Sequence, residues 1–179
     1  MTAPLLAAGT WAVSDSRTRV TFRVGNLGRQ AHGSVACSWG ELRLDGGGRP
    51  VAVRAELDLN SLDTGIAKRD ADLRKPRLLD IDRHPTMSWS ADRFTPADDG
   101  SWTAEGTLCV RGTAAPLTVV GTAEADGSWL RVRARGELDR RAGGRHPGAV
   151  PRHRPHGHDR AGGLAHTGRA VAAGWPGGQ

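Results

Sequence analysis

The chain has 179 residues, of which 37% are hydrophobic and 25% charged, a composition typical of one soluble globular domain. No run approaches the roughly 18 apolar residues of a membrane-spanning helix, and the N-terminal stretch has no basic n-region, so we expect a cytoplasmic protein without integral membrane association. Of the net charge of +6, residues 141–179 contribute +5, with six arginines and one acidic residue. Residues 1–140 are nearly neutral, which argues against a nucleic-acid partner.

Alternation of apolar and polar residues predicts antiparallel strands along most of the chain. Over residues 51–59 every odd position is apolar, with Arg54, Glu56 and Asp58 between them, so one face packs and the other meets water. The same pattern predicts strands at about 20–24, 34–44, 86–94, 101–111, 116–124 and 130–135. Glycine-containing turns at 45–48, 96–100 and 126–127 indicate consecutive hairpins. Such a meander folds as a barrel or a sandwich, and closure leaves no exposed edge.

The segment 64–74 interrupts this alternation. Its spacing of Ile66, Ala67, Asp70 and Leu73 fits a short helical face. Asp63 or Thr64 can cap the first turn. We therefore expect a helix of two or three turns, followed by an irregular arm that reaches residue 82.

The residues of this insertion fall in order and at matching spacing on a recognisable family motif: Ser61, Asp63, Thr64, Gly65, Arg69, Asp70, Leu73, Arg74, Asp80, Pro85 and Thr86. On them the chain resembles the YceI-like family of isoprenoid-binding, lipocalin-like barrels, over residues of about 10–140. Four positions within the motif depart from the family pattern: Leu78-Leu79 replace a double aromatic, Asp72 a histidine and His84 a tyrosine. The resemblance implies an all-β fold, an antiparallel lipocalin-like barrel with a short helical insertion.

The resemblance also implies a function, the non-catalytic binding or carriage of an isoprenoid or similar long-chain lipid, with no cofactor or metal. The ligand would lie in an apolar cavity, held by burial of its surface at about 25 cal/mol per Å². Alternation points the candidate ligand-binding side chains inward: Phe22, Val24, Val35, Trp39, Val53, Leu57, Met87, Trp89, Trp102, Leu108, Val110 and Val119. From the residues alone, a filled core remains the alternative. It would suit a structural or stress-related interaction domain.

The charged group between Asp70 and His84 offers a further alternative, a hydrolase or a metal-dependent enzyme. Basic residues separate its aspartates, which favours a structural role in capping the helix and fixing the arm. No nucleophile or phosphate-loop motif is present. Cys37 and Cys109 lack the spacing of a redox or metal pair, so we assign no catalytic or metal-binding residue.

From residue 141 onward the composition changes to glycine, proline, arginine and histidine, with four scattered large apolar residues. We expect residues 141–179 to be a separate tail, disordered or the product of a shifted reading frame. A barrel domain over 10–140 would then lack its final strand. The open seam would expose an edge and allow dimerisation. Within the tail, His153, His156 and His158 could bind a transition metal only if the segment were ordered.

Overall fold

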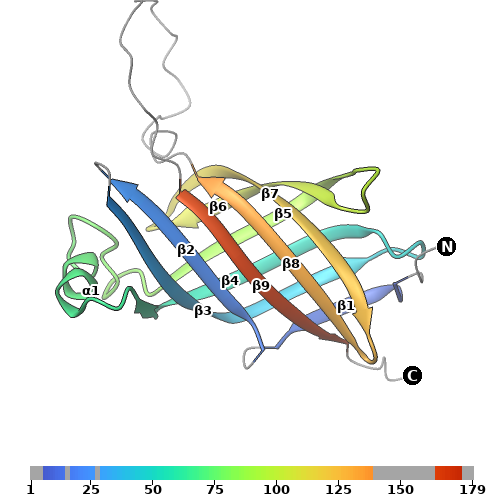
Figure 1. Cartoon of the computed structure of the whole chain (residues 1–179), viewed down its shortest axis with the longest axis horizontal. Helices are drawn as coiled ribbons and strands as arrows, with labels where there is room; N and C mark the ends of the chain where they lie inside the picture. Colours follow the sequence, from blue (N-terminus) through green and yellow to red (C-terminus); the bar gives the residue numbers. More distant parts are fainter. Residues whose placement is uncertain (1–5, 15–16, 27–28, 139–163, 175–179) are drawn as a thin grey trace, which may run out of the picture.

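A computed structural model describes residues 6–14, 17–26, 29–138 and 164–174, with the backbone alone at 23–26, 29–31, 137–138 and 164–174. These residues form nine strands and one short helix (Figure 1). The elements are β1 (Gly9–Val13), β2 (Arg19–Asn26), β3 (Arg29–Leu44), β4 (Pro50–Asp63), α1 (Ala67–Leu73), β5 (Thr86–Pro96), β6 (Trp102–Val110), β7 (Thr113–Asp126), β8 (Trp129–Leu138) and β9 (Leu164–Gly174).

The strands form one antiparallel barrel. Each strand from β2 to β8 pairs with the next strand along the chain, and β9 pairs back onto β2. The short strand β1 lies beyond β2, between the remaining lengths of β3 and β9. The pairings therefore run round the barrel, and the predicted all-β barrel with a short helical insertion is confirmed.

The final strand is a correction to the sequence analysis, which expected none after residue 140. β9 pairs with β8 along Leu164–Ala173 and with β2 along Leu164–Arg169. Backbone pairing needs only free amide and carbonyl groups on both sides, so a strand of small and polar residues fits between two edges without the alternation that marked the others. The tail histidines His153, His156 and His158 lie outside the described residues.

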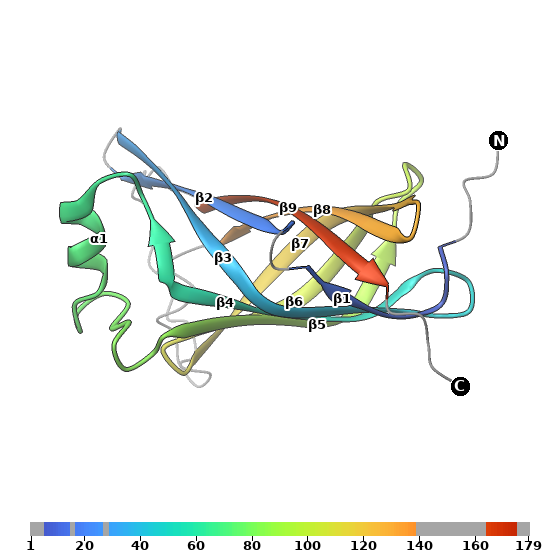
Figure 2. The ribbon, with the colours of Figure 1, turned by 90° about the horizontal axis from the view of Figure 1, so that it is seen from below.

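The two ends of the barrel are built differently. The three predicted hairpin turns, between β3 and β4, β5 and β6, and β7 and β8, gather at one end, and α1 projects from the other (Figures 1 and 2). At the hairpin end Leu42, Leu44 and Leu130 form a buried cluster, with Trp11 and Val53 packed against it. This end is filled by side chains.

A turn that the sequence analysis did not predict joins β6 to β7 at the α1 end. Arg111 and Gly112 both have positive φ, 54° and 72°, as in the two-residue turns that match the twist of a hairpin. A non-glycine residue in this region is uncommon and strained.

Candidate ligand-binding interior

Cross-strand register identifies the side chains that face the interior, because directly opposite residues share one face of a sheet. Val35, Cys37 and Leu108 are buried. Val20 lies opposite Val35, and Trp89 lies opposite Leu108. Leu57 lies opposite both Cys37 and Met87. These partners therefore line the barrel interior in the half nearer α1.

Several of these inward side chains are only half-buried: Phe22, Leu57, Met87, Trp89 and Val110. Buried Leu59, Leu108 and Leu117 lie among them on β4, β6 and β7. This half of the barrel therefore presents apolar surface that its own side chains cover incompletely. The contrast is with the hairpin end, where Leu130 is fully buried.

The predicted interior residues divide between the two ends. Val35 and Leu108 are buried, and Val119 is half-buried and lies opposite buried Ala104. Val53 instead packs against the cluster at the hairpin end, and Trp102 lies at that end, opposite Pro96. Val53 and Trp102 therefore lie apart from the predicted interior residues of the α1 half. The side chain of Val24 lies outside what the structure describes.

Trp39 is a second correction, because its side chain faces outward and is 46% exposed. Cys37 lies opposite Leu57, but Trp39 lies opposite the next residue back on β4, Glu56, so Ser38 is an extra residue in β3. Such a β-bulge reverses the faces of all residues beyond it. The alternation therefore placed Trp39 inward only because the bulge has no clear signal in the sequence.

The arm that follows α1 is attached to β4 near the end of the barrel. Ile81 is 1% exposed, as is Leu59 at the end of β4. The amide of Leu59 donates to the carbonyl of Pro85 over 2.8 Å, which joins β4 to the return of the arm. Neither residue was predicted from the sequence to belong to the site. Leu59 was within the alternation, whereas Ile81 stands alone between two aspartates.

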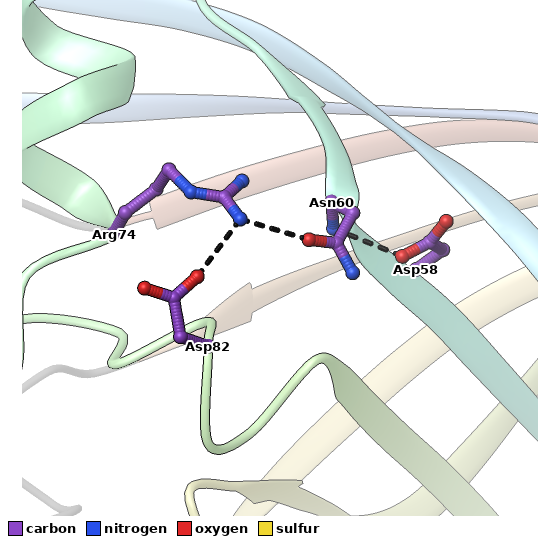
Figure 3. A network of polar contacts seen from close by, with 4 residues as sticks. All are labelled: Asp58, Asn60, Arg74 and Asp82. Carbon is purple, nitrogen blue, oxygen red and sulfur yellow. Dashed lines mark hydrogen bonds and ion pairs between the residues drawn. The ribbon is translucent and has the colours of Figure 1, made fainter.

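Polar contacts hold α1 and the arm in place. Asp70 accepts bonds from the hydroxyl of Thr64 over 2.6 Å and from its amide over 3.1 Å. The guanidinium of Arg74 donates to Asp82 and to Asn60, each over 3.0 Å, and so links the arm to β4 (Figure 3). In the same view the backbone amide of Asn60 donates to the carboxylate of Asp58.

Neither predicted cap of α1 is present, since the N-cap is Ile66 and makes no side-chain bond. Asp63 instead accepts from the amide of Gly65 over 2.7 Å. The turn at Arg111 is tied to the arm as well, because its guanidinium donates to the carbonyl of Leu78 over 2.7 Å. The strained backbone of Arg111 thus accompanies a contact that only a long cationic side chain makes.

The comparisons with known proteins agree with this geometry. A family model described as the YceI-like domain matches residues 11–150. The chain belongs to the YceI-like family. The predicted resemblance is confirmed, although no curated protein matches the chain.

Solved structures share this YceI-like fold. Burkholderia cenocepacia BcnA aligns with a TM-score of 0.72 at 16% identity, over 90% of this chain and 99% of that one. A polyisoprenoid binding domain from Saccharophagus degradans, implicated in plant cell wall breakdown, aligns at 0.59 and 8% identity, over 93% of this chain and 99% of that one. At such low identity the likeness shows the fold alone.

Most charged groups described in this YceI-like barrel lie at its surface, whereas Asp80 is buried. Lys75, by a hydrogen bond and its charge, lowers the pKa of Asp72, and Arg77 and Lys68 add to the effect. Among the described residues no group of three histidine, cysteine, aspartate or glutamate side chains could hold a metal ion. Within the same residues, no helix has the length and apolar character needed to cross a membrane.

The two thiols differ in surroundings. Cys37 is buried and its thiol donates to the carbonyl of Trp39 over 3.2 Å. Burial raises the pKa of Cys37. Cys109 is half-buried and free, and it lies opposite Ser88, between the inward residues Leu108 and Val110. The two cysteines therefore face opposite sides of the wall and form no pair.

A hollow of about 570 Å³ lies on the outer wall of the barrel rather than inside it. Arg19, Thr122, Arg133 and Arg135 are among its lining residues. Arg133 lies opposite Thr122. Its neighbour Val132 faces inward, so the side chain of Arg133 faces outward. None of the predicted ligand-binding residues whose side chains the structure describes lines this hollow.

Proposed function

We propose that this YceI-like barrel binds or carries an isoprenoid or similar long apolar chain in its interior and catalyses no reaction. The observation that carries the proposal is the apolar surface that faces inward in the α1 half. Five side chains of this surface are only half-buried: Phe22, Leu57, Met87, Trp89 and Val110. A flexible apolar chain is stabilised there by the surface it removes from water. A polyisoprenoid binding domain with the same fold supports the class of ligand.

The charged arm supports a carrier over an enzyme. Asp70 is engaged by Thr64, and Asp82 by Arg74. These contacts fix the arm near the barrel end, so the two carboxylates already have a structural task. A general base needs a carboxylate that can reach the proton it abstracts.

The first test is mass spectrometry of an organic extract of the purified full chain, followed by titration of the emptied protein with a polyprenol. We expect a prenyl lipid in near-stoichiometric amount, or saturable uptake of the polyprenol. An empty extract together with no uptake by folded protein would overturn the proposal in favour of a filled core.

A pair of variants locates the ligand. Met87→Trp enlarges an inward side chain of β5 and is expected to weaken polyprenol binding at least about tenfold by occupying its space. Ser90→Trp adds the same ring to the same strand on its exposed outer face and should leave binding unchanged. Equal losses in both variants would show that the ligand does not occupy the interior.

A further inference from the structure

The two ends of the barrel differ in charge. The turns of the hairpin end carry Asp45, Asp98, Asp99 and Asp126, with two basic residues beside them, Arg49 and Arg131, the latter paired with Asp126. At the other end, residues 64–84 contain six basic and four acidic residues. The hairpin end is therefore acidic and the α1 end basic, and these ends lie at opposite ends of the long axis (Figures 1 and 2).

The acidic residues of the α1 end have partners within it. Asp72 pairs with Lys75, and Asp82 pairs with Arg74. Asp70 is held by Thr64, and Asp80 is buried. Basic residues therefore outnumber acidic ones by two in this segment, although the side chain of Asp82 is also exposed.

Three exposed basic residues contribute to this excess. Lys68, Arg77 and Arg83 are exposed and form no ion pair with another residue that the structure describes. Lys68 lies on α1, and the other two lie on the arm. An anionic surface would meet them first.

Exposed aliphatic side chains lie at the same end. Ile66, directly before α1, is 47% exposed, and Leu78 on the arm is 42% exposed. The other large apolar residues recorded as exposed among the described residues, Trp39 and Val120, lie on β3 and β7 of the barrel wall. Aliphatic groups amid basic ones are the combination that binds a lipid headgroup layer.

We propose that the α1 end docks on the surface of an anionic lipid bilayer, with Ile66 and Leu78 entering the headgroup layer and Lys68, Arg77 and Arg83 contacting lipid phosphates. The inference rests on the proposed function, because a carrier of an apolar chain must exchange it with a membrane. An acidic protein partner fits less well. Residues 64–84 contain no aromatic side chain, and aromatic anchors dominate protein interfaces.

The test is co-sedimentation of the full chain with vesicles of phosphatidylglycerol and phosphatidylcholine, compared with vesicles of phosphatidylcholine alone. We expect partition onto the anionic vesicles that falls as salt is added. The double variant Ile66→Ser, Leu78→Ser and the double variant Lys68→Glu, Arg77→Glu should each lose about tenfold or more in partition. Matched controls on the barrel wall, Trp39→Ser and Arg93→Glu, should bind as the parent chain does.

Binding that is equal on neutral and anionic vesicles, or that falls as much in the wall controls as in the α1 variants, would overturn the proposal. Absence of binding at low salt would do the same. The polyprenol titration contains no vesicles, so its result is independent. A chain that takes up polyprenol but ignores vesicles refutes only the docking surface. Vesicle binding with an empty extract and no polyprenol uptake refutes the carrier.

Discussion

The indole ring of Trp89 occupies the space in which a side chain at Gly106 would stand. A Cβ added to Gly106 would lie 2.6 Å from two atoms of the ring and 2.7 Å from the carbonyl oxygen of Ser90. The ring nitrogen donates to the carbonyl of Leu117 over 3.1 Å. Because these residues lie on β5, β6 and β7, one side chain joins three strands. Phe22 stands against Gly33 in the same way on β2 and β3.

Gly106→Ala should therefore destabilise the barrel by about 1–3 kcal/mol, since the added methyl group meets both a ring and a backbone carbonyl that cannot move independently. Urea unfolding followed by circular dichroism measures the change. Gly46→Ala is the matched control, because a Cβ at Gly46 has no neighbour within 4 Å. Equal stability of the two variants would show that Trp89 and the Ser90 carbonyl yield to the methyl group at little cost.

Glycine opposite an aromatic ring also shows what the sequence could not provide. Alternation placed Phe22 and Trp89 inward, and they lie opposite buried or interior positions, but it gave no reason for the glycines that accommodate their rings. Trp39 was misplaced because one extra residue in β3 reverses the faces. β9 was missed because its pairing depends on two free edges that only the folded barrel supplies.

In the segment of α1 and the arm, local structure could be predicted from the sequence, whereas tertiary contacts could not. Its helix could be predicted from spacing, because helical periodicity is a local property. Its attachment could not, since Arg111 and Leu78 are 33 residues apart in sequence. Ile81 likewise carries no periodic signal, yet it is among the most deeply buried side chains described.

The variant Arg111→Asn should distinguish the role of Arg111 in the turn between β6 and β7 from its role in holding the arm through Leu78. Asparagine tolerates positive φ better than arginine does, so the global free energy of unfolding should change by less than about 1 kcal/mol. The loss of the bond to Leu78 should speed amide hydrogen exchange in residues 75–84, measured by mass spectrometry. Arg93→Asn, on the wall, is the control and should leave the arm unchanged. Unaltered exchange in Arg111→Asn would mean that the other contacts suffice to hold the arm.

The two thiols should differ in reactivity. Burial raises the pKa of Cys37, so less of it is thiolate at any given pH, and access is blocked as well. At pH near 8 we expect iodoacetamide to modify Cys109 at least about tenfold faster than Cys37. Peptide mapping after timed quenching measures both rates, and the Cys109→Ser variant isolates the slower one. Comparable rates would place Cys37 at an accessible position, contrary to its register.

Acid should release the turn between β5 and β6. Bonds from the hydroxyl and amide of Ser101 lower the pKa of Asp99 below its ordinary value of 3.8. A carboxylate whose pKa is lower in the folded state stabilises the fold above the ordinary value, and the contribution disappears as the pH falls through the folded value. The difference in melting temperature between the parent chain and Asp99→Ala should thus be present at pH 7 and vanish well below pH 3.8. Asp92→Ala, which removes an exposed carboxylate from the neighbouring strand, is the control; a difference that persists in acid would contradict the assignment.

Removal of β9 should open the barrel. A chain that ends at Arg140 leaves β2 without its pairing along Arg19–Val24 and β8 without its pairing along Trp129–Leu138. Two unpaired edges are a template for strand addition between molecules. Light scattering after gel filtration should therefore give a higher mass for this chain than for one that ends at Gly174, at equal concentration. Equal masses and equal melting temperatures would mean that β2 and β8 do not depend on β9, and that the barrel is stable without its final strand.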